Sequence, residues 1–372
     1  MNFLTDLFYN IGNFTWQQGV MIIIGGLLIY LAIKRDMEPA LLLPIGFGAI
    51  LVNLPFSGVL GADGVITTLF NAGIANELFP LLLFIGIGAM IDFGPLLSNP
   101  KMLLFGAAAQ FGIFMTLSLA SLIGFDMKDA ASIAIIGAAD GPTSIFVANY
   151  FKSNYFGAIT VAAYSYMAMV PMVQPPVIRL ITTKAERRIR MKYRPATITK
   201  TTRILFPIIV TVIAGTVAPT SVGLIGFLMF GNLIRECGVL RSLSDSAQNQ
   251  LANIITLLLG ITIAFRMQAA DFLRIETLVI MALGLFAFVF DTVGGVMFAK
   301  LINLFSKEKI NPMIGAAGIS AFPMSARVIH KMGLQEDPQN YLLMHAAGAN
   351  VSGQIASVIA GGLIISLVNG VI

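Results

Sequence analysis

The stretch IIGAADGPTSIF, residues 135–146, lies between apolar segments but combines an acid, two glycines, a proline and two hydroxyl side chains. Its neighbours on both sides have the composition of membrane spans, where an ionised aspartate costs on the order of 2.5–3.5 kcal/mol. Asp140 therefore requires a cation, a proton or a basic partner. Gly141 and Pro142 interrupt a helix beside it and free backbone carbonyl groups. The stretch predicts a broken helix that places a functional carboxylate inside the membrane.

The overall composition indicates a polytopic α-helical membrane protein. Of the 372 residues, 57% are hydrophobic and only 11% are charged, whereas a soluble domain has about 25% charged residues. The apolar runs are long and unbroken, unlike the ~10-residue alternating segments of a transmembrane β-barrel. The first 18 residues lack the basic region of a cleavable signal peptide. One cysteine excludes an intramolecular disulfide, and two histidines are too few for a histidine-built site.

Positive charge is concentrated in one segment of the chain. Nine of the 23 Lys and Arg residues fall within 179–203, where Glu186 is the only acid. In a membrane protein such a cluster marks a cytoplasmic loop. The net charge of +5 is therefore interpreted as a topology signal, and we do not expect nucleic-acid binding.

Counting apolar segments outward from this loop predicts about ten membrane spans. They are expected at 19–33, 40–54, 66–91, 102–124, 157–178, 204–219, 221–235, 250–265, 275–299 and from about 341 onward. If residues 131–150 enter the membrane and return to the same side, Lys34, Arg35 and Lys101 all lie in the cytoplasm. The positive-inside rule favours this re-entrant path over a full crossing.

A second interrupted segment resembles the first. Residues 314–323 read IGAAGISAFP and match IGAADGPTSI, residues 136–145, at an offset of 178 residues that the spans follow roughly. If both segments are re-entrant, paired spans run in opposite directions, as in an inverted-topology repeat with a binding site near the midplane. Close helix packing by small residues is the alternative interpretation. The predicted units are a first repeat 1–178 with broken segment 131–150, a basic cytoplasmic linker 179–203, and a second repeat 204–372 with broken segment 310–330.

The residue types around Asp140 are those that bind a hard cation such as Na⁺. The carboxylate, freed carbonyls and the hydroxyls of Thr143 and Ser144 supply oxygen ligands only. Asp140 is also a suitable N-cap for a helix that starts at Pro142. The two roles are compatible.

The second half offers further polar residues around its own break. Asn311, Ser320, Ser325 and Arg327 surround the broken segment, while Asn350, Gln354 and Ser357 share one face of the last span. Arg327 is either an ordinary charge at the cytoplasmic end or a clamp for a planar carboxylate.

Two tyrosines lie in the span that follows the first break. Tyr164 and Tyr166 stand two residues apart, so only one is expected to face the site. A tyrosine can donate a hydrogen bond to a reacting group or relay a proton. The other acids near the spans, Glu77, Asp92 and Asp291, are expected to be structural more often than ligands.

Four motifs together carry a family resemblance. GAADGPTSIFVANYF, DTVGGVMFAKLIN, NPMIGAAGISAFPMSARV and HAAGANVSGQIASVIAGG closely resemble the β subunit of biotin-dependent, sodium-translocating decarboxylases of oxaloacetate, methylmalonyl-CoA and glutaconyl-CoA. The resemblance covers nearly the whole chain. It implies a multi-pass subunit of the bacterial inner membrane that decarboxylates carboxybiotin, consumes a proton and exports Na⁺. It also implies a carboxyltransferase α subunit, a biotin carrier protein, a small membrane-anchored γ or δ subunit, and self-association as a further expectation.

The resemblance assigns roles to particular residues of this chain. It implies Asp140, Tyr166 and Arg327 as catalytic, Asn311, Gly315 and Arg327 near carboxybiotin, and Asp140, Ser320, Asn350 and Ser357 as Na⁺ ligands. The chain has no AMKM-like biotin-attachment sequence, so biotin is expected to arrive on the carrier. From physics alone, a Na⁺–carboxylate symporter, a Na⁺/H⁺ antiporter or a passive membrane scaffold are the rival interpretations.

Overall fold

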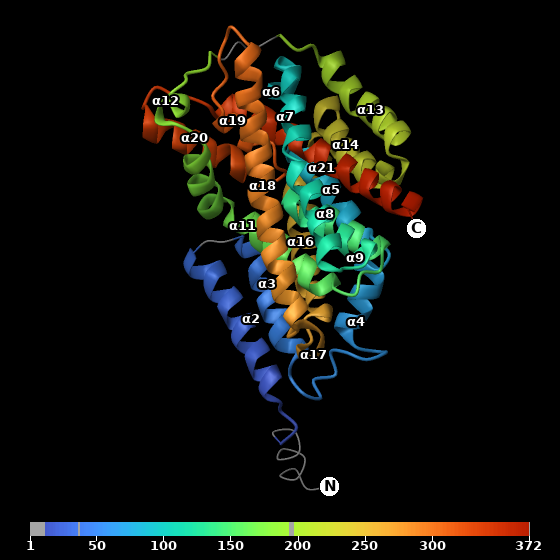
Figure 1. Ribbon diagram of the computed structural model, residues 1–372. Helices are drawn as coiled ribbons and strands as arrows, with labels where there is room; N and C mark the ends of the chain where they lie inside the picture. The colour runs from blue at the N-terminus through green and yellow to red at the C-terminus, as the bar shows by residue number, and fades with distance from the viewer. Residues whose placement is uncertain (1–11, 36–37, 193–196, 372) are drawn as a thin grey trace.

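The computed structural model describes residues 12–35, 38–192 and 197–371, and within them all regular structure is helical (Figure 1). The first half contains α2 (Trp16–Arg35), α3 (Pro39–Val52), α4 (Val65–Leu69), α5 (Leu78–Met90), α6 (Gly94–Ser98), α7 (Leu103–Ala108), α8 (Phe111–Ile123), α9 (Met127–Ala134), α10 (Gly141–Tyr150), α11 (Phe156–Ile181) and α12 (Lys184–Arg187). The second half contains α13 (Lys200–Val217), α14 (Val222–Cys237), α15 (Arg241–Asp245), α16 (Ala252–Ile263), α17 (Ala269–Phe272), α18 (Ile275–Phe305), α19 (Met313–Ala316), α20 (Met324–Glu336) and α21 (Leu343–Val371). The predicted all-α class is confirmed.

The helices that could cross a membrane are fewer than predicted. Six helices of the described chain are long and apolar enough, and up to eight if each of two bent helix pairs counts as one span. The prediction of about ten also counted α3 and α14, which have only 14 and 16 residues, whereas a span needs about 20. The structure therefore shows a membrane protein with six to eight candidate spans, and the count of ten is not confirmed.

Close backbone contacts at glycines hold several helix pairs together. A Cβ atom on Gly25 of α2 would lie only 2.6 Å from the carbonyl oxygen of Gly46 in α3. Gly88 of α5 and Gly231 of α14 face each other's helix backbone in the same way. Because lipid offers no hydrophobic drive between helices, such close approach is a main source of packing energy. These contacts fix how each helix is rotated relative to its neighbour.

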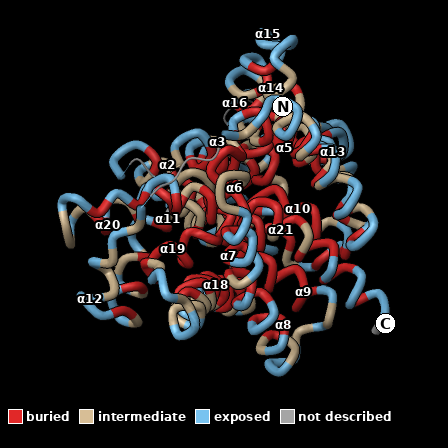
Figure 2. Tube along the Cα trace, turned by 90° about the horizontal axis from the view of Figure 1, so that it is seen from above, coloured by how far each residue is buried: buried red, intermediate tan, exposed pale blue. Residues whose placement is uncertain are grey.

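The two interrupted segments meet in the buried centre of the molecule (Figure 2). In the first, α9 continues into a 3₁₀ turn, Ile135–Ala138, and α10 begins after Asp140. In the second, helix is absent between the end of α19 and the start of α20. The backbone N–H of Ser320 donates a hydrogen bond of 3.0 Å to the carbonyl of Ala138. The predicted pairing of the two breaks is thus matched by a direct contact between them.

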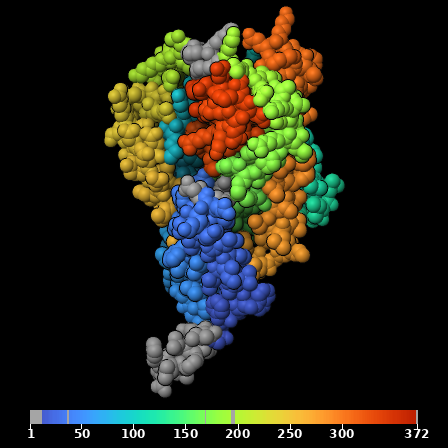
Figure 3. Space-filling model, turned by 90° about the vertical axis from the view of Figure 1, so that its left-hand side faces the viewer, coloured from blue at the N-terminus to red at the C-terminus, as the bar shows by residue number. Residues whose placement is uncertain are grey.

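The basic linker and α20 lie at the end of the molecule opposite the N-terminal helices (Figures 1 and 3). The Arg187 guanidinium pairs with Glu336 at 2.7 Å, and Arg190 pairs with Asp337 at 2.6 Å. The Arg190 guanidinium beside Asp337 lowers the pKa of that carboxyl, so the pair stays charged at neutral pH. The linker is therefore fastened to the C-terminal end of α20.

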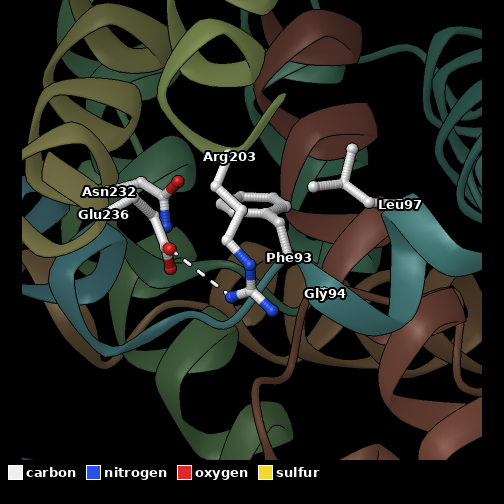
Figure 4. A pocket seen from close by; sticks show the side chains of 6 residues that line it. All are labelled: Phe93, Gly94, Leu97, Arg203, Asn232 and Glu236. Atoms are coloured by element: carbon white, nitrogen blue, oxygen red, sulfur yellow. Dashed lines mark hydrogen bonds and ion pairs between the residues drawn. The ribbon is translucent and has the colours of Figure 1, made fainter. Parts of the chain in front are cut away.

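A separate polar cluster joins the start of α13 to the turn after α5 (Figure 4). Arg203 lies 3.5 Å from Asp92 and 3.4 Å from Glu236, while the Asn232 side chain donates to the carbonyl of Ile91 at 2.9 Å. The space among these side chains holds no water-sized void. Asp92 thus has the structural role that the sequence analysis preferred for it.

Candidate functional site

The first break is built around the carboxylate of Asp140. Ala139 adopts a left-handed conformation with φ of 52°, which ends the 3₁₀ turn and redirects the chain. Asp140 then caps α10, because its side chain accepts hydrogen bonds from the Thr143 amide at 3.4 Å and the Thr143 hydroxyl at 2.8 Å. The predicted N-cap role is confirmed, and Pro142 occupies the first turn where proline is tolerated.

A residue from the last helix completes the surroundings of this carboxylate. The Ser357 hydroxyl, on α21, donates to the same Asp140 oxygen as Thr143 does, at 2.9 Å. Asp140 is only 4% exposed, and it forms no ion pair with any residue in the described ranges. A buried carboxylate with two hydroxyl groups is an all-oxygen environment of the kind that hard cations prefer.

The second break is held by the side chain of Asn350. Its amide nitrogen donates to the carbonyls of Ile319 at 2.7 Å and Ala317 at 3.2 Å, which satisfies backbone groups that the missing helix leaves open. Its carbonyl oxygen is buried and has no hydrogen-bond partner in the described part of the chain. Asn350 therefore positions the break and also presents an oxygen atom that a ligand can use.

Ser320 lies where the two breaks and α21 converge. Besides its backbone contact with Ala138, its hydroxyl donates to the Gly353 carbonyl at 3.1 Å, and its own carbonyl accepts from the Gln354 amide. The four Na⁺ ligands predicted from the sequence are thus connected. Asn350 and Ser357 lie on α21 and contact the second break and Asp140, respectively. Ser320 joins the second break to the first through its backbone hydrogen bond to Ala138. Thr143 joins them as a further hydroxyl group on Asp140.

The tyrosine that packs on Gly141, next to Asp140, is Tyr164, whereas the Tyr166 ring lies beside Gly284 of α18 together with Ile136. The Tyr164 ring packs so closely on the Cα atom of Gly141 that a Cβ there would overlap the ring. Its hydroxyl is buried and has no hydrogen-bond partner among the described residues. The Tyr166 hydroxyl instead donates to the carbonyl of Met281 in α18. Two-residue spacing indicated that the rings diverge, but it did not tell which one faces the site.

Asn311 contacts the linker, and Gly315 contacts α18. The Asn311 amide donates to the linker carbonyls of Arg187 at 2.8 Å and Ile189 at 2.9 Å, and its oxygen accepts from the Met313 amide. Gly315 lies inside α19, where a Cβ would collide with the carbonyl of Gly295. Gly315 is thus helical, and its lack of a Cβ allows close packing between α19 and α18.

Arg327 lies on the exposed side of α20. Its side chain forms no ion pair with the residues that the structure describes, although it stands one turn from the start of that helix. Its neighbour Ser325 is buried and donates to the Gln174 side chain at 2.9 Å. Arg327 is thus accessible from the end of the molecule where the linker lies, apart from the Asp140 cluster.

The same chain shows clear similarity to known proteins. A family model described as the β subunit of Na⁺-transporting oxaloacetate decarboxylase matches residues 17–368. The glutaconyl-CoA decarboxylase β subunit of Acidaminococcus fermentans is 49% identical over 357 residues, covering 96% of this chain and 95% of that protein. The methylmalonyl-CoA decarboxylase β subunit of Veillonella parvula is 48% identical, covering 96% and 94%. A probable oxaloacetate decarboxylase β chain of Vibrio cholerae is 43% identical, covering 97% and 98%.

Proposed function

The chain belongs to the family of Na⁺-transporting oxaloacetate decarboxylase β subunits, and we propose that it decarboxylates carboxybiotin carried by a partner protein. In this proposal, CO₂ release and proton consumption drive Na⁺ outward across the membrane. The observation that carries the proposal is the buried oxygen cluster of Asp140, Thr143 and Ser357 at the junction of two broken helices.

Na⁺ binds at this cluster as the transported ion. Asp140 supplies the charged oxygen and Ser357 and Thr143 supply hydroxyl oxygens, while the unpartnered Asn350 oxygen and Ser320 complete the proposed set. Broken helices that point backbone groups at a midplane site are the recurrent solution in secondary transporters. Only an ion or ligand that binds two conformations differently can shift the balance between them.

The proposed architecture is an inverted repeat of 1–178 and 204–372 joined by the linker 179–203. Matching contacts support it. Asn53 at the end of α3 donates to the carbonyl of Met267 at 2.8 Å, and Asn232 in α14 donates to that of Ile91 at 2.9 Å. The two donors, Asn53 and Asn232, lie nearly 178 residues apart in the sequence, and so do the two acceptors, Ile91 and Met267. The packing follows the same rule, since α3 lies against α16 as α14 lies against α5.

The partners follow from the proposed chemistry. A carboxyltransferase α subunit transfers the carboxyl group to biotin on a carrier protein. A small membrane-anchored γ or δ subunit and further copies of this chain complete the complex. Relatives named for three different substrates each match nearly the whole of this chain at 43% to 49% identity. We therefore place substrate choice in the α subunit and the Na⁺ step here, in the inner membrane of a bacterium. Arg327, exposed at the linker end, is proposed to orient the arriving carboxylate.

The proposal is tested with the purified chain and free carboxybiotin. We expect CO₂ release that rises with Na⁺ and not with K⁺, and uptake of radioactive Na⁺ into proteoliposomes only while carboxybiotin is supplied. A secondary transporter would instead move Na⁺ without carboxybiotin, and a passive scaffold would release no CO₂. Either of those results would contradict the proposed function.

The two tyrosines give a sharper prediction about the site. Tyr164→Phe should raise the Na⁺ concentration for half-maximal activity about tenfold, because it removes a buried, unpartnered hydroxyl from the ring that packs on Gly141, next to Asp140. Tyr166→Phe should leave that concentration unchanged and cost about 1 kcal/mol of stability through its lost hydrogen bond to Met281. Na⁺ titrations of CO₂ release and thermal unfolding separate the two. If Tyr166→Phe alone changes the activity, the role implied by the family resemblance is correct and the Tyr164 assignment fails.

A further inference from the structure

A second buried acid lies close to the first break, on α18. Asp291 is near the middle of this 31-residue helix, and its exposed fraction is 0%. It forms no ion pair with any residue in the described ranges. A carboxylate in a membrane span is costly unless something compensates its charge. The two oxygen atoms of Asp291 have different surroundings, and the difference indicates what compensates it.

The carboxyl group of Asp291 accepts hydrogen bonds from the start of α8. The backbone N–H of Ile113 donates to Oδ1 at 3.2 Å, and that of Gly112 donates to the same carboxyl group. The two helices touch here, because a Cβ on Gly112 would lie 2.2 Å from the carbonyl oxygen of Ala287. Free N–H groups at a helix N-terminus stabilise negative charge. The start of α8 therefore supports the ionised form of Asp291.

The other oxygen atom of Asp291, Oδ2, is buried and has no hydrogen-bond partner in the described part of the chain. It faces Gly137 of the first break, where an added Cβ would lie 2.7 Å from Oδ2 and 2.8 Å from the Cβ of Ala287. Buried polar atoms without a partner are uncommon in folded proteins. A proton on Oδ2 would remove the negative charge from this apolar contact.

The surroundings of Oδ2 suit a proton better than a metal ion. A hard cation takes several oxygen ligands, but the neighbours of Oδ2 at this contact are Gly137 and Ala287, and the space between them does not admit even a methyl group. A proton needs no such space. Asp140 differs, since the hydroxyls of Thr143 and Ser357 lie against it. The two buried acids thus offer an all-oxygen site at Asp140 and a bare carboxyl oxygen at Asp291.

Few ionisable groups lie on the elements packed against α18. Its neighbours α7, α8, α19 and the 3₁₀ turn Ile135–Ala138 carry no ionisable side chain. On α9 such groups are Lys128 and Asp129, on α11 Tyr164, Tyr166 and Arg179, and on α18 itself Glu276 and Lys300. None of them pairs with Asp291 in the described ranges. The charge of Asp291 is therefore set by the α8 amides, by burial and by a proton.

Gly137 connects Asp291 to the Na⁺ site proposed at Asp140. It belongs to the 3₁₀ turn that Ala139 ends just before Asp140. A change of charge at Oδ2 acts on this turn, because Gly137 lies directly against Oδ2. If Asp291 loses its proton when Na⁺ binds at Asp140, the summed charge of the two acids and the ion stays constant. Such an exchange avoids adding net charge to the membrane interior.

We propose that Asp291 is a proton-binding residue, which holds a proton while the Asp140 site is without Na⁺ and releases it when Na⁺ binds. Uptake adds H⁺ to Oδ2 and gives the neutral acid. Release returns H⁺ to water and leaves the carboxylate that the amides of Gly112 and Ile113 stabilise. The inference rests on the proposed function, whose proton and Na⁺ steps it joins through the first break.

The first test measures proton release without decarboxylation. Purified protein in weakly buffered detergent solution receives NaCl or KCl without carboxybiotin at a series of pH values, and a pH indicator reports released protons. The unchanged protein should release up to about one proton per chain with Na⁺ and none with K⁺. Asp291→Asn should release none, although its side-chain oxygen can still accept from the α8 amides. Release that persists in this variant would overturn the assignment, because Asp140 would then be the source.

Asp129→Asn is the matched control, since Asp129 is also buried but both of its oxygen atoms have donors. The Ser153 hydroxyl donates to Oδ1 at 2.6 Å, and the Asn154 side chain donates to Oδ2 at 3.2 Å. This control should keep the full Na⁺-dependent proton release, with a lower unfolding temperature from its altered hydrogen bonds. If the unchanged protein binds radioactive Na⁺ but releases no proton, the proposal is refuted.

A second measurement does not require that Asp291→Asn folds. Infrared spectra of Asp140→Asn should retain a protonated carboxyl band that shifts in D₂O, at a pH where exposed acids are ionised. Absence of any such band would overturn the Asp291 assignment. Proton release on Na⁺ binding by a protein that cannot decarboxylate carboxybiotin would uphold Asp291 and contradict the proposed function. Na⁺-dependent decarboxylation without this proton release would do the reverse.

Discussion

Asp140→Asn should abolish Na⁺-dependent decarboxylation and Na⁺ uptake. The substitution removes the charged oxygen from a site that is 4% exposed and otherwise neutral. Loss of one partner in a buried charged contact costs on the order of 3 kcal/mol, about 100-fold in Na⁺ affinity. The measurements are CO₂ release and Na⁺ uptake in proteoliposomes across a wide range of Na⁺ concentrations.

The fold of this variant should survive, which makes the result informative. Asparagine is as good an N-cap as aspartate, because its oxygen can accept from the Thr143 amide while its NH2 group donates to the hydroxyl oxygens of Thr143 and Ser357. Asp271→Asn is the matched control, because Asp271 is exposed and pairs with Arg274 three residues away at 2.8 Å. This control should change activity less than twofold, as expected for an exposed ion pair. Normal Na⁺ uptake by Asp140→Asn would refute the ligand assignment.

Gly315→Ala should destabilise the protein strongly. The added Cβ would overlap the backbone carbonyl of Gly295, which cannot move aside as a flexible side chain can. Overpacking of this kind costs about 3 kcal/mol or more when backbone must shift. The expected result is a lower unfolding temperature in detergent and a smaller monodisperse fraction at equal expression.

Two further glycine substitutions serve as controls, one at the facing glycine and one at a glycine with open space around it. A Cβ on residue 295 would meet the Gly315 carbonyl, so Gly295→Ala should be about equally harmful. The double variant should be less harmful than the sum, because both substitutions force the same separation of α18 and α19. Gly26→Ala lies on α2 with nothing within 4 Å of the added Cβ. It should be neutral or slightly stabilising, because alanine favours helix. An unaltered unfolding temperature for Gly315→Ala would show that α19 and α18 can separate without cost.

The positions of the two helix breaks could be predicted from the sequence. Asp140 beside Gly141 and Pro142 indicated both a carboxylate in need of a partner and a helix start, and the structure has that N-cap. The repeat of IGAA 178 residues later indicated a second break, and Ser320 contacts Ala138 there. These features are local, since capping preferences and breaker residues act within a few residues of chain.

The sequence also suffices to predict a membrane protein, but it does not suffice to predict the number of membrane spans. Low charge and long apolar runs suffice to exclude a soluble domain. The lengths of α3 and α14, however, depend on where their ends pack, and apolar runs alone placed them among full spans. Helix boundaries follow from capping and tertiary contacts that composition does not encode.

The sequence by itself thus determined that the chain is an all-α membrane protein with a buried aspartate at one of two matching breaks. Tertiary structure alone decided that Ser357 reaches Asp140, that Tyr164 rather than Tyr166 packs on Gly141, and that Asn311 holds the linker. Helical periodicity tells which residues share a face, but it leaves the rotation of that face open. Backbone contacts at glycines such as Gly315 and Gly141 set that rotation, because they allow one close approach and exclude the others.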